Sequence, residues 1–201
     1  MFTGIVTAVG RIESARAAGD GVRLRVDAQG LGMDDVAIGD SIAVQGVCLT
    51  VVARDAGAFE ADVSKATLAV THGLEGGRAV NLEKSLRASD RMGGHFVAGH
   101  VDAVGTVIAF DDLGGSFRLE IEVPGELSRY IARKASITVD GVSLTVNEAG
   151  ARTFVVNIIP HTRAVTTFRN LGAGSRVNLE VDLLARYVER LLGEDSRKVA
   201  K

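Results

Sequence analysis

The sequence predicts an all-β fold of two small six-stranded antiparallel barrels in tandem, followed by a C-terminal α-helix. The first observation is a repeat: VQGVCLTV begins at Val44 and returns as VDGVSLTV 95 residues later, at Val139. The second is a series of short alternating apolar runs separated by glycine turns. The third is a single helical stripe that follows Asp182. We therefore expect three parts, at residues 1–95, 96–182 and 183–201.

The duplication covers nearly the whole of both halves. With the same offset of 95, GIVTAVG at Gly4 aligns with GHVDAVG at Gly99, and Thr67 aligns with Thr162. Two extra residues then enter the second copy before the segment VNLE recurs. Because solenoid repeats have periods of about 20 to 50 residues, this longer period indicates two complete domains.

Each copy is expected to form about six strands. In the first copy the glycine turns divide the strands into residues 4–12, 22–26, 41–44, 47–51, 59–64 and 79–83. In the second copy the strands are expected at residues 97–108, 117–123, 136–139, 142–147, 153–159 and 176–180. Residues 31–36 could hold one helical turn, and the polar, glycine-ended residues 85–94 are interpreted as the linker. Long helical patterns are too few for a parallel sheet, so closed antiparallel barrels fit best.

The C-terminal stripe predicts a helix that ends at Gly193, with Asp182 as its N-cap by default. Its apolar side chains are Leu183, Leu184, Tyr187, Val188, Leu191 and Leu192. A helix this short is marginal alone, so its stripe must pack on its own barrels or on the same helix of another chain. We favour self-association, and we expect residues 193–201 to be a solvated tail.

Composition excludes several classes of protein. A net charge of −2 gives no electrostatic footprint for nucleic acid. The sequence shows no signal peptide and no membrane span, so we expect a cytoplasmic protein with no membrane partner. Cys48 is the only cysteine, which excludes an internal disulfide and a multi-cysteine metal site. Metal and dinucleotide motifs are also lacking.

The repeated motif predicts a polar face on each barrel. If Val47, Leu49 and Val51 fill the first barrel, then Cys48 and Thr50 point outward. The equivalent outward residues of the second barrel are Ser143 and Thr145, and the neighbouring polar positions are Asp62, Ser64 and Asn157. Small polar side chains beside a glycine suit a flat heteroaromatic ligand. The alternative is that these residues simply decorate a solvated strand face.

The two copies differ on their surfaces more than in their scaffolds. The differing pairs are Cys48 and Ser143, Ile5 and His100, Thr7 and Asp102, Gly39 and Lys134, and Ala66 and His161. This pattern suits two sites that hold one kind of ligand in different roles, and neutral drift would also produce it. On a strand, His95 and His100 would lie on opposite faces, which disfavours a shared metal. His100 could act as an acid or base, or it could bond Asp102.

Four segments together resemble alpha-type riboflavin synthase, whose chain contains two Greek-key lumazine-binding barrels. They are MFTGIV, the duplicated G-V-[CS]-L-T-V, GGHFVAGHVD and the two VNLE segments, and the resemblance runs from Met1 to about Leu192. It implies a dismutation in which two 6,7-dimethyl-8-ribityllumazine molecules give riboflavin and 5-amino-6-ribitylaminouracil. It also implies a cofactor-free homotrimer built through the C-terminal helix, with each site shared between the N-terminal barrel of one chain and the C-terminal barrel of its neighbour.

The resemblance also implies the site residues. In the first barrel the implied ligand contacts are Gly4, Ile5, Val6, Cys48, Leu49, Thr50, Asp62, Val63, Ser64, Lys65, Ala66 and Thr67. In the second they are Gly99, His100, Val101, Lys134, Ser143, Leu144, Thr145, Asn157, Ile158, Ile159, Pro160, His161 and Thr162. The implied catalytic residues are Cys48, His100, Ser143, Thr145 and Asp182.

This sequence departs from the family pattern in one segment. The family usually carries Glu before the Thr of an E-T-L segment, where this chain has Ala66, and the second copy continues after Thr162 with Arg163. The alternatives to an enzyme are a non-catalytic lumazine- or flavin-binding antenna protein and a trimeric scaffold.

Overall fold

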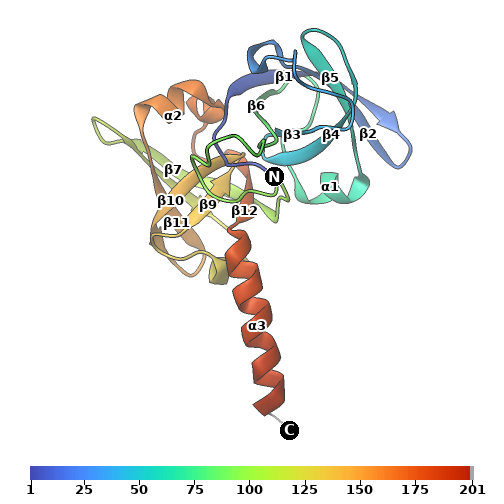
Figure 1. Ribbon diagram of the computed structural model, residues 1–201. Coiled ribbons are helices and arrows are strands. Elements are labelled where there is room, and N and C mark those ends of the chain that lie inside the picture. The colour runs from blue at the N-terminus through green and yellow to red at the C-terminus, as the bar shows by residue number, and fades with distance from the viewer. Residues whose placement is uncertain (200–201) are drawn as a thin grey trace.

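The structure is a computed structural model that describes residues 1–199, with side chains through Leu192. Figure 1 shows two barrels side by side and one long helix that projects away from them. The first barrel consists of β1 (Ala8–Ala18), β2 (Gly21–Asp27), β3 (Ser41–Val44), β4 (Val47–Arg54), β5 (Ala58–Val63) and β6 (Ala79–Lys84). The second consists of β7 (Ala103–Asp112), β8 (Phe117–Glu122), β9 (Ser136–Val139), β10 (Val142–Ala149), β11 (Thr153–Ile158) and β12 (Arg176–Val181).

Both barrels are closed and share one strand order. Neighbouring strands run β1-β2-β5-β4-β3-β6 in the first barrel. In the second they run β10-β11-β8-β7-β12-β9, which is the same closed order of equivalent strands, read in the opposite direction from another starting strand. The expected fold of two six-stranded antiparallel barrels is therefore confirmed. Closure pairs the strand edges, which would otherwise be open to aggregation.

Each barrel has its own apolar core. The equivalent residues Phe59 and Phe154 are 0% and 1% exposed, and each packs inside its own cluster of aliphatic side chains. Burying a phenylalanine side chain contributes about 2 to 3 kcal/mol to stability. The two cores are separate, as expected for a duplicated domain.

The first strand of each copy begins later than the sequence predicted. β1 starts at Ala8 and β7 at Ala103, whereas strands were expected from residues 4 and 97. Gly4 and Gly99 have φ angles of +76° and +78°, in the left-handed region that interrupts a strand. β1 also continues to Ala18, because its polar outer half still pairs with β2 in a hairpin.

Several short helices were missed or misplaced by the sequence analysis. The helices α1 (Lys65–Val70) and α2 (Pro160–Val165) follow β5 and β11, where the strands were expected to end. Six residues are too few to show a helical period, so these helices carry no sequence signal. A 3₁₀ turn occupies Gln29–Leu31 instead of residues 31–36, and two more lie at Ser128–Tyr130 and Thr167–Asn170.

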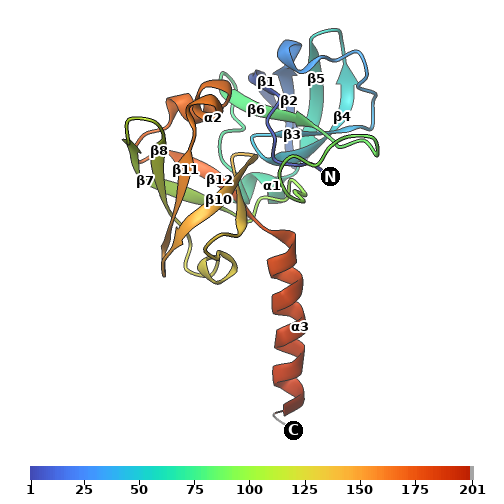
Figure 2. The ribbon, with the colours of Figure 1, turned by 60° about the vertical axis from the view of Figure 1, so that its left-hand side comes forward.

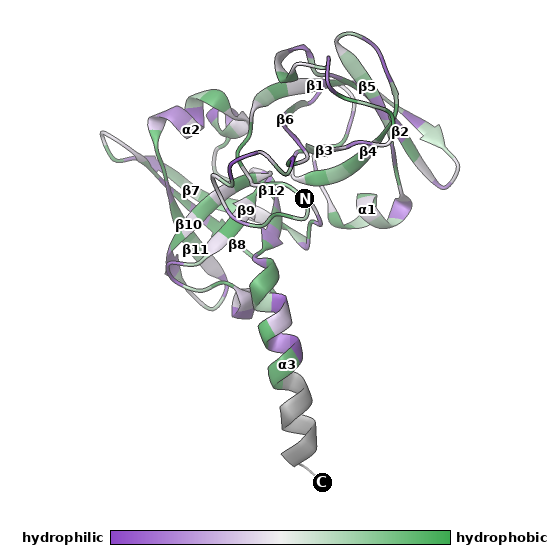
Figure 3. Cartoon of the chain, in the orientation of Figure 1, coloured by the Kyte–Doolittle hydropathy of each residue, from purple (hydrophilic) through white to green (hydrophobic). Residues whose placement is uncertain are grey.

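The C-terminal helix α3 (Leu183–Val199) is longer than predicted, because it continues through Gly193. Figures 1 and 2 show from two sides that it extends away from both barrels. Its stripe remains open: Leu184 is 65% and Leu191 is 66% exposed, and Figure 3 shows hydrophobic residues recurring along its coloured part. Among the described residues, we find no helix with the length and apolar character needed to cross a membrane.

Two hairpin turns pack back to back where the barrels meet. Gln45 and Gly46 connect β3 to β4 with φ angles of 51° and 83°, and Asp140 and Gly141 connect β9 to β10 with 48° and 80°. Positive φ at both central residues is typical of a type I′ turn. A Cβ atom on Gly46 would lie 2.7 Å from the Gly141 nitrogen, so this approach of the two backbones requires glycine.

The asparagines of the two VNLE segments join the barrels across this interface. Asn81 of the first barrel donates from Nδ2 to the Asp140 carbonyl at 2.8 Å, and its Oδ1 accepts from the Thr167 nitrogen at 2.8 Å. Asn178 of the second barrel donates to the Gln45 carbonyl at 2.9 Å. Each asparagine therefore bonds the backbone of the opposite barrel, which gives the repeated motif a structural reason.

Candidate active site

The outward face predicted for the repeated motif is present on both barrels. Val47, Leu49 and Val51 are 3%, 4% and 0% exposed, whereas Cys48 is half-buried and Thr50 is exposed. In the second barrel Ser143 is half-buried and Thr145 exposed, while the inward-facing Leu144 is only half-buried. The thiol and the hydroxyl thus occupy equivalent places at the edge of two open faces.

The structure corrects how the predicted segments group. Gly4–Val6 was assigned with Cys48 to the first barrel, but the Gly4 carbonyl accepts a hydrogen bond from the Ser143 nitrogen at 2.8 Å. Gly99 was assigned with Ser143, but its carbonyl accepts from the Cys48 nitrogen at 2.8 Å. The segment that precedes the first strand of each barrel, at Gly4 or Gly99, therefore contacts the candidate site of the other barrel. We call it the leading segment.

Ser143 has a histidine partner that the sequence analysis did not identify. The Oγ of Ser143 lies 2.7 Å from Nδ1 of His95, and Thr138 Oγ1 lies 3.3 Å from Nε2. Burial lowers the pKa of His95, and the smaller, opposing influence is the charge of Asp182. A neutral imidazole beside a hydroxyl can take up or deliver a proton.

Cys48 has a different environment. It packs against a small apolar cluster formed by Phe2, Ala43 and Val97, and Ala43 is the equivalent of Thr138 in the second barrel. The thiol therefore borders apolar side chains, and the hydroxyl borders polar ones. This is a chemical difference between two otherwise equivalent sites.

One of the two roles considered for His100, a hydrogen bond to Asp102, is disfavoured by the other partners of that carboxylate. The Asp102 carboxylate accepts from the Val181 nitrogen at 2.8 Å and forms an ion pair with Arg186 of α3, so these groups occupy it instead of His100. His100 is exposed and lines a cavity of about 280 Å³ together with Glu180 and Arg186. It remains available to a ligand at that edge.

Asp182 acts as the N-cap of α3, as expected by default. Its Oδ1 accepts from the Leu184 nitrogen at 2.9 Å, which satisfies one of the free donors of the first turn. The same carboxylate influences His95, so the cap and the Ser143 neighbourhood are electrostatically connected.

The remaining predicted ligand segments lie at the starts of α1 and α2. Ser64 caps α1, because its Oγ accepts from the Thr67 nitrogen at 3.1 Å. The equivalent residue in the second copy is Ile159, which cannot cap, and Pro160 follows at the first helical position. Ala66 and His161 lie in these two helices.

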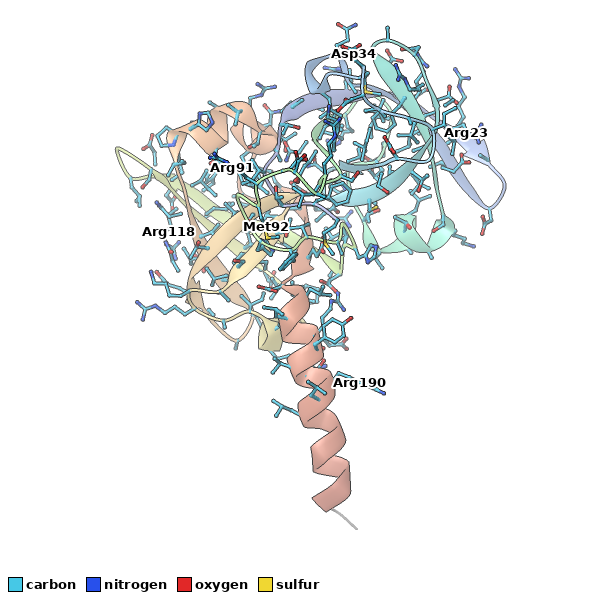
Figure 4. All side chains as sticks on the ribbon, in the orientation of Figure 1. Arg23, Asp34, Arg91, Met92, Arg118 and Arg190 are labelled. Atoms are coloured by element: carbon cyan, nitrogen blue, oxygen red, sulfur yellow. The ribbon has the colours of Figure 1, made fainter. Side chains whose placement is uncertain are left out.

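The polar residues at the ends of β5 and β11 differ in their engagement. The Asp62 carboxylate accepts two bonds from Arg23, both at 2.7 Å, and this contact lowers the Asp62 pKa. Asn157 pairs in register with Arg118, but Arg118 bonds Glu120 at 2.8 Å. Figure 4 shows the equivalent residues Arg23 and Arg118 on opposite sides of the molecule.

Two further residues distinguish the second barrel. Lys134 holds a φ of +70°, where its first-barrel equivalent is Gly39, so a strained backbone presents an exposed ammonium beside β9. Arg163 of α2 lies with its guanidinium carbon 4.4 Å from the Phe117 ring centre and 5.7 Å from that of Phe110. This cation–π contact holds α2 against β7 and β8.

A cavity beside the first barrel does not include the two residues at the centre of the candidate faces. It measures about 660 Å³ and lies between the first barrel and the linker, lined by Ile5, Glu83 and Arg91 among others. Figure 4 shows Arg91 and Met92 in front of the region between the barrels. Neither this cavity nor the one beside His100 is lined by Cys48 or Ser143. Thr50, Thr145 and Asn157 are exposed, so part of each candidate face is open to solvent within one chain.

Comparisons with known proteins agree with this architecture. The lumazine binding domain family matches residues 3–85 and 98–182. Riboflavin synthase of Photobacterium phosphoreum is 47% identical over 194 residues, covering 96% of this chain and 89% of that protein. The riboflavin synthases of Mycobacterium tuberculosis and Bacillus subtilis are 46% and 39% identical over 96% of this chain, covering 98% and 90% of those proteins.

Solved structures of LumP share the fold. LumP complexed with riboflavin has a TM-score of 0.81 at 27% identity, covering 90% of this chain and 99% of that one. LumP complexed with 6,7-dimethyl-8-(1'-D-ribityl) lumazine has a TM-score of 0.79 with the same identity and coverage.

Proposed function

The chain belongs to the lumazine binding domain family and, within it, to the riboflavin synthases, and we propose that its two barrels hold two identical substrates in different chemical roles. The enzyme transfers a four-carbon unit from one 6,7-dimethyl-8-ribityllumazine to another. The products are riboflavin and 5-amino-6-ribitylaminouracil. The atoms of two substrates equal those of the two products, so the overall reaction consumes no oxidant. The chemical requirement is to treat two identical molecules differently.

The second barrel is the donor site in this proposal. The methyl group at carbon 7 of the donor must lose a proton, and the ring stabilises the carbanion that results. Ser143 Oγ, 2.7 Å from a His95 imidazole whose pKa is lowered by burial, supplies a hydroxyl and imidazole pair suited to accepting that proton. Thr145 and Asn157 fix the ring edge and Lys134 attracts the electron-rich side of the ligand.

The first barrel is the acceptor site. Cys48, or a water beside it, adds to the acceptor ring and marks it for attack by the donor carbanion. The surroundings of Cys48 favour this division, because the apolar Phe2, Ala43 and Val97 supply no base. Thr50 and the turn at Ser64 hold the acceptor, and much of the rate comes from holding two rings face to face.

A homotrimer assembled through α3 brings a donor face of one chain against an acceptor face of its neighbour. Two observations support this proposal. Part of each candidate face is open within one chain, and the α3 stripe is exposed, with Tyr187 at 62% and Leu192 at 65%. The base of the helix is fixed by polar contacts instead, including Arg129 to Glu189 at 2.9 Å. We expect the trimer to be cytoplasmic.

The single observation that carries the proposal is the contrast between a His95-paired hydroxyl and an apolar-packed thiol at equivalent places. The test follows deuterium exchange at the methyl on carbon 7 by NMR in D₂O, alongside riboflavin absorbance. The parent protein should show both exchange and turnover. His95→Ala should lose exchange and turnover, whereas Cys48→Ser should keep exchange while turnover falls.

The outcomes separate the competing functions. Loss of exchange in Cys48→Ser with retention in His95→Ala would reverse the donor and acceptor assignment. Tight binding of the lumazine without turnover by the parent would indicate a non-catalytic binding protein, and absence of binding would indicate a scaffold.

A further inference from the structure

The glutamate of the first VNLE segment holds the leading segment of the chain in place. Glu83 is 6% exposed, and its Oε1 accepts from the Thr3 nitrogen and from Thr3 Oγ1, both at 2.7 Å. Its Oε2 accepts from the Gly4 nitrogen at 3.0 Å. Apart from a β-bridge between Phe2 and Val97, residues 1–7 lie outside the regular strands, so the carboxylate adds its bonds to Thr3 and Gly4 to the backbone bonds that hold this segment.

The glutamate of the second VNLE segment repeats the arrangement. Glu180 is 5% exposed, and it accepts from the Ala98 nitrogen at 2.8 Å and from the Gly99 nitrogen at 3.0 Å. Here too the held segment precedes the first regular strand, β7, and turns through a glycine with positive φ. The two clamps are therefore equivalent by the duplication.

Each clamped glycine contacts the reactive residue of the opposite barrel. The Gly4 carbonyl accepts from the Ser143 nitrogen, and a Cβ atom on Gly4 would lie 2.6 Å from the Ser143 Cβ. The Gly99 carbonyl accepts from the Cys48 nitrogen, and a Cβ atom there would lie 2.6 Å from the Cys48 Cβ. The glycine backbones therefore pack directly beside Ser143 and Cys48, and their positions limit where these two residues can lie.

We propose that Glu83 and Glu180 are positioning residues that act across the barrel boundary, Glu83 on Ser143 and Glu180 on Cys48. Glu83 reaches the Ser143 site by a second path, because the Thr3 carbonyl accepts from the His95 nitrogen at 3.1 Å. Each barrel thus fixes the reactive group of the other through a carboxylate. This inference rests on the roles proposed for Ser143 and Cys48, but it makes a structural claim that can be tested without turnover.

The first test uses the reactivity of the only cysteine. Glu180→Gln keeps the shape of the side chain but replaces one acceptor oxygen with a donor that opposes a backbone N–H. Release of the Gly99 segment should speed alkylation of Cys48 by iodoacetamide roughly tenfold, the change expected when one charge-assisted hydrogen bond is lost. Glu83→Gln, the matched control, should alkylate at the parent rate. Equal rates in all three proteins, or equal acceleration in both variants, would overturn the proposal.

The second test reads the Ser143 site. Glu83→Gln should move the NMR titration of His95 toward that of an exposed histidine and lower kcat more than it raises KM, while Glu180→Gln leaves the His95 titration unchanged. Should Glu83→Gln fail to fold, Thr3→Val removes one bond to the clamp and should shift His95 in the same direction. An unmoved His95 in a folded variant contradicts the proposal, whereas a parent without turnover contradicts only the proposed function.

Discussion

Asp140, in the turn that joins the two barrels, should make the stability of this protein fall as pH rises toward neutrality. The residue is 2% exposed, and its Oδ1 accepts from the Asn178 nitrogen at 2.8 Å. Burial raises the pKa of Asp140 to about 7, and the bond from the Asn178 backbone opposes that rise only in part. Gln45, its equivalent in the first barrel, is uncharged and accepts from the Asn81 nitrogen at 2.9 Å. Asp140→Asn should therefore preserve the bond while removing the titration.

The direction of this pH dependence of stability follows from the uptake of a proton on folding. Between the ordinary value of 3.8 and about 7, Asp140 is ionised in the unfolded chain and protonated in the folded one. Folding then takes up a proton, so the contribution of Asp140 to stability is full below the lower value and is lost as pH rises through the higher one. A shift of roughly three units corresponds to a ceiling of about 4 kcal/mol.

The assay is urea denaturation followed by far-ultraviolet circular dichroism at pH 5, 6, 7 and 8. The free energy of unfolding of Asp140→Asn, relative to the parent, should increase by about 1.4 kcal/mol per pH unit between the two pKa values and level off above about pH 7. Asp20→Asn, on an exposed turn, controls for the loss of one carboxylate. A difference between Asp140→Asn and parent that does not change with pH would refute the reasoning.

Three further predictions concern the site and the assembly. Ser143→Ala should lower turnover more than it weakens lumazine binding, measured by steady-state kinetics and fluorescence titration, and an unchanged rate would remove Ser143 from the mechanism. Deletion of residues 184–201 should give monomers on a sizing column that bind ligand but barely turn over, and full activity in a monomer would exclude a site shared between chains. Arg163→Leu copies Leu68 of the first barrel, so it should fold but lose about 1 kcal/mol of stability with the contact to Phe117, and unchanged urea denaturation would show that contact to be neutral.

The fold could be predicted from the sequence because the repeat, the glycine turns and the period-two alternation are all visible within short segments. VQGVCLTV contains its own turn, Gln45-Gly46, and its own inward row, so both barrels and the outward placement of Cys48 and Ser143 follow from a few residues. The helices α1 and α2 lie below the length at which a helical period can be recognised. The helix α3 continues past its predicted end at Gly193, because a single glycine within a run of good helix formers destabilises a helix by only about 1 kcal/mol.

The exchange between barrels could not be predicted from the duplication. An offset of 95 shows that Gly4 is equivalent to Gly99 and Cys48 to Ser143, but equivalence is not contact. Gly4 belongs with Ser143 only because the two copies pack about a pseudo-two-fold arrangement at the hairpin turns. The contact between His95 and Ser143 could not be predicted for the same reason. The two residues are 48 positions apart in the sequence, and Ser143 lies on the strand that Gly4 also contacts.

This crossed packing bears on how a duplicated domain can become asymmetric without losing its fold. The elements at the barrel boundary are reciprocal. Asn81 and Asn178 each bond the opposite barrel, and Glu83 and Glu180 each hold a segment that contacts it. Reciprocal contacts require the two backbones to remain alike, whereas the side chains beside Cys48 and Ser143 are free to differ. Thr138 beside His95 and Ala43 beside Cys48 are one such difference, at positions that pair in the same register with Ser143 and Cys48. A reaction between two identical molecules needs this combination, because identical scaffolds bind the same ligand twice and unlike neighbours assign each copy its role.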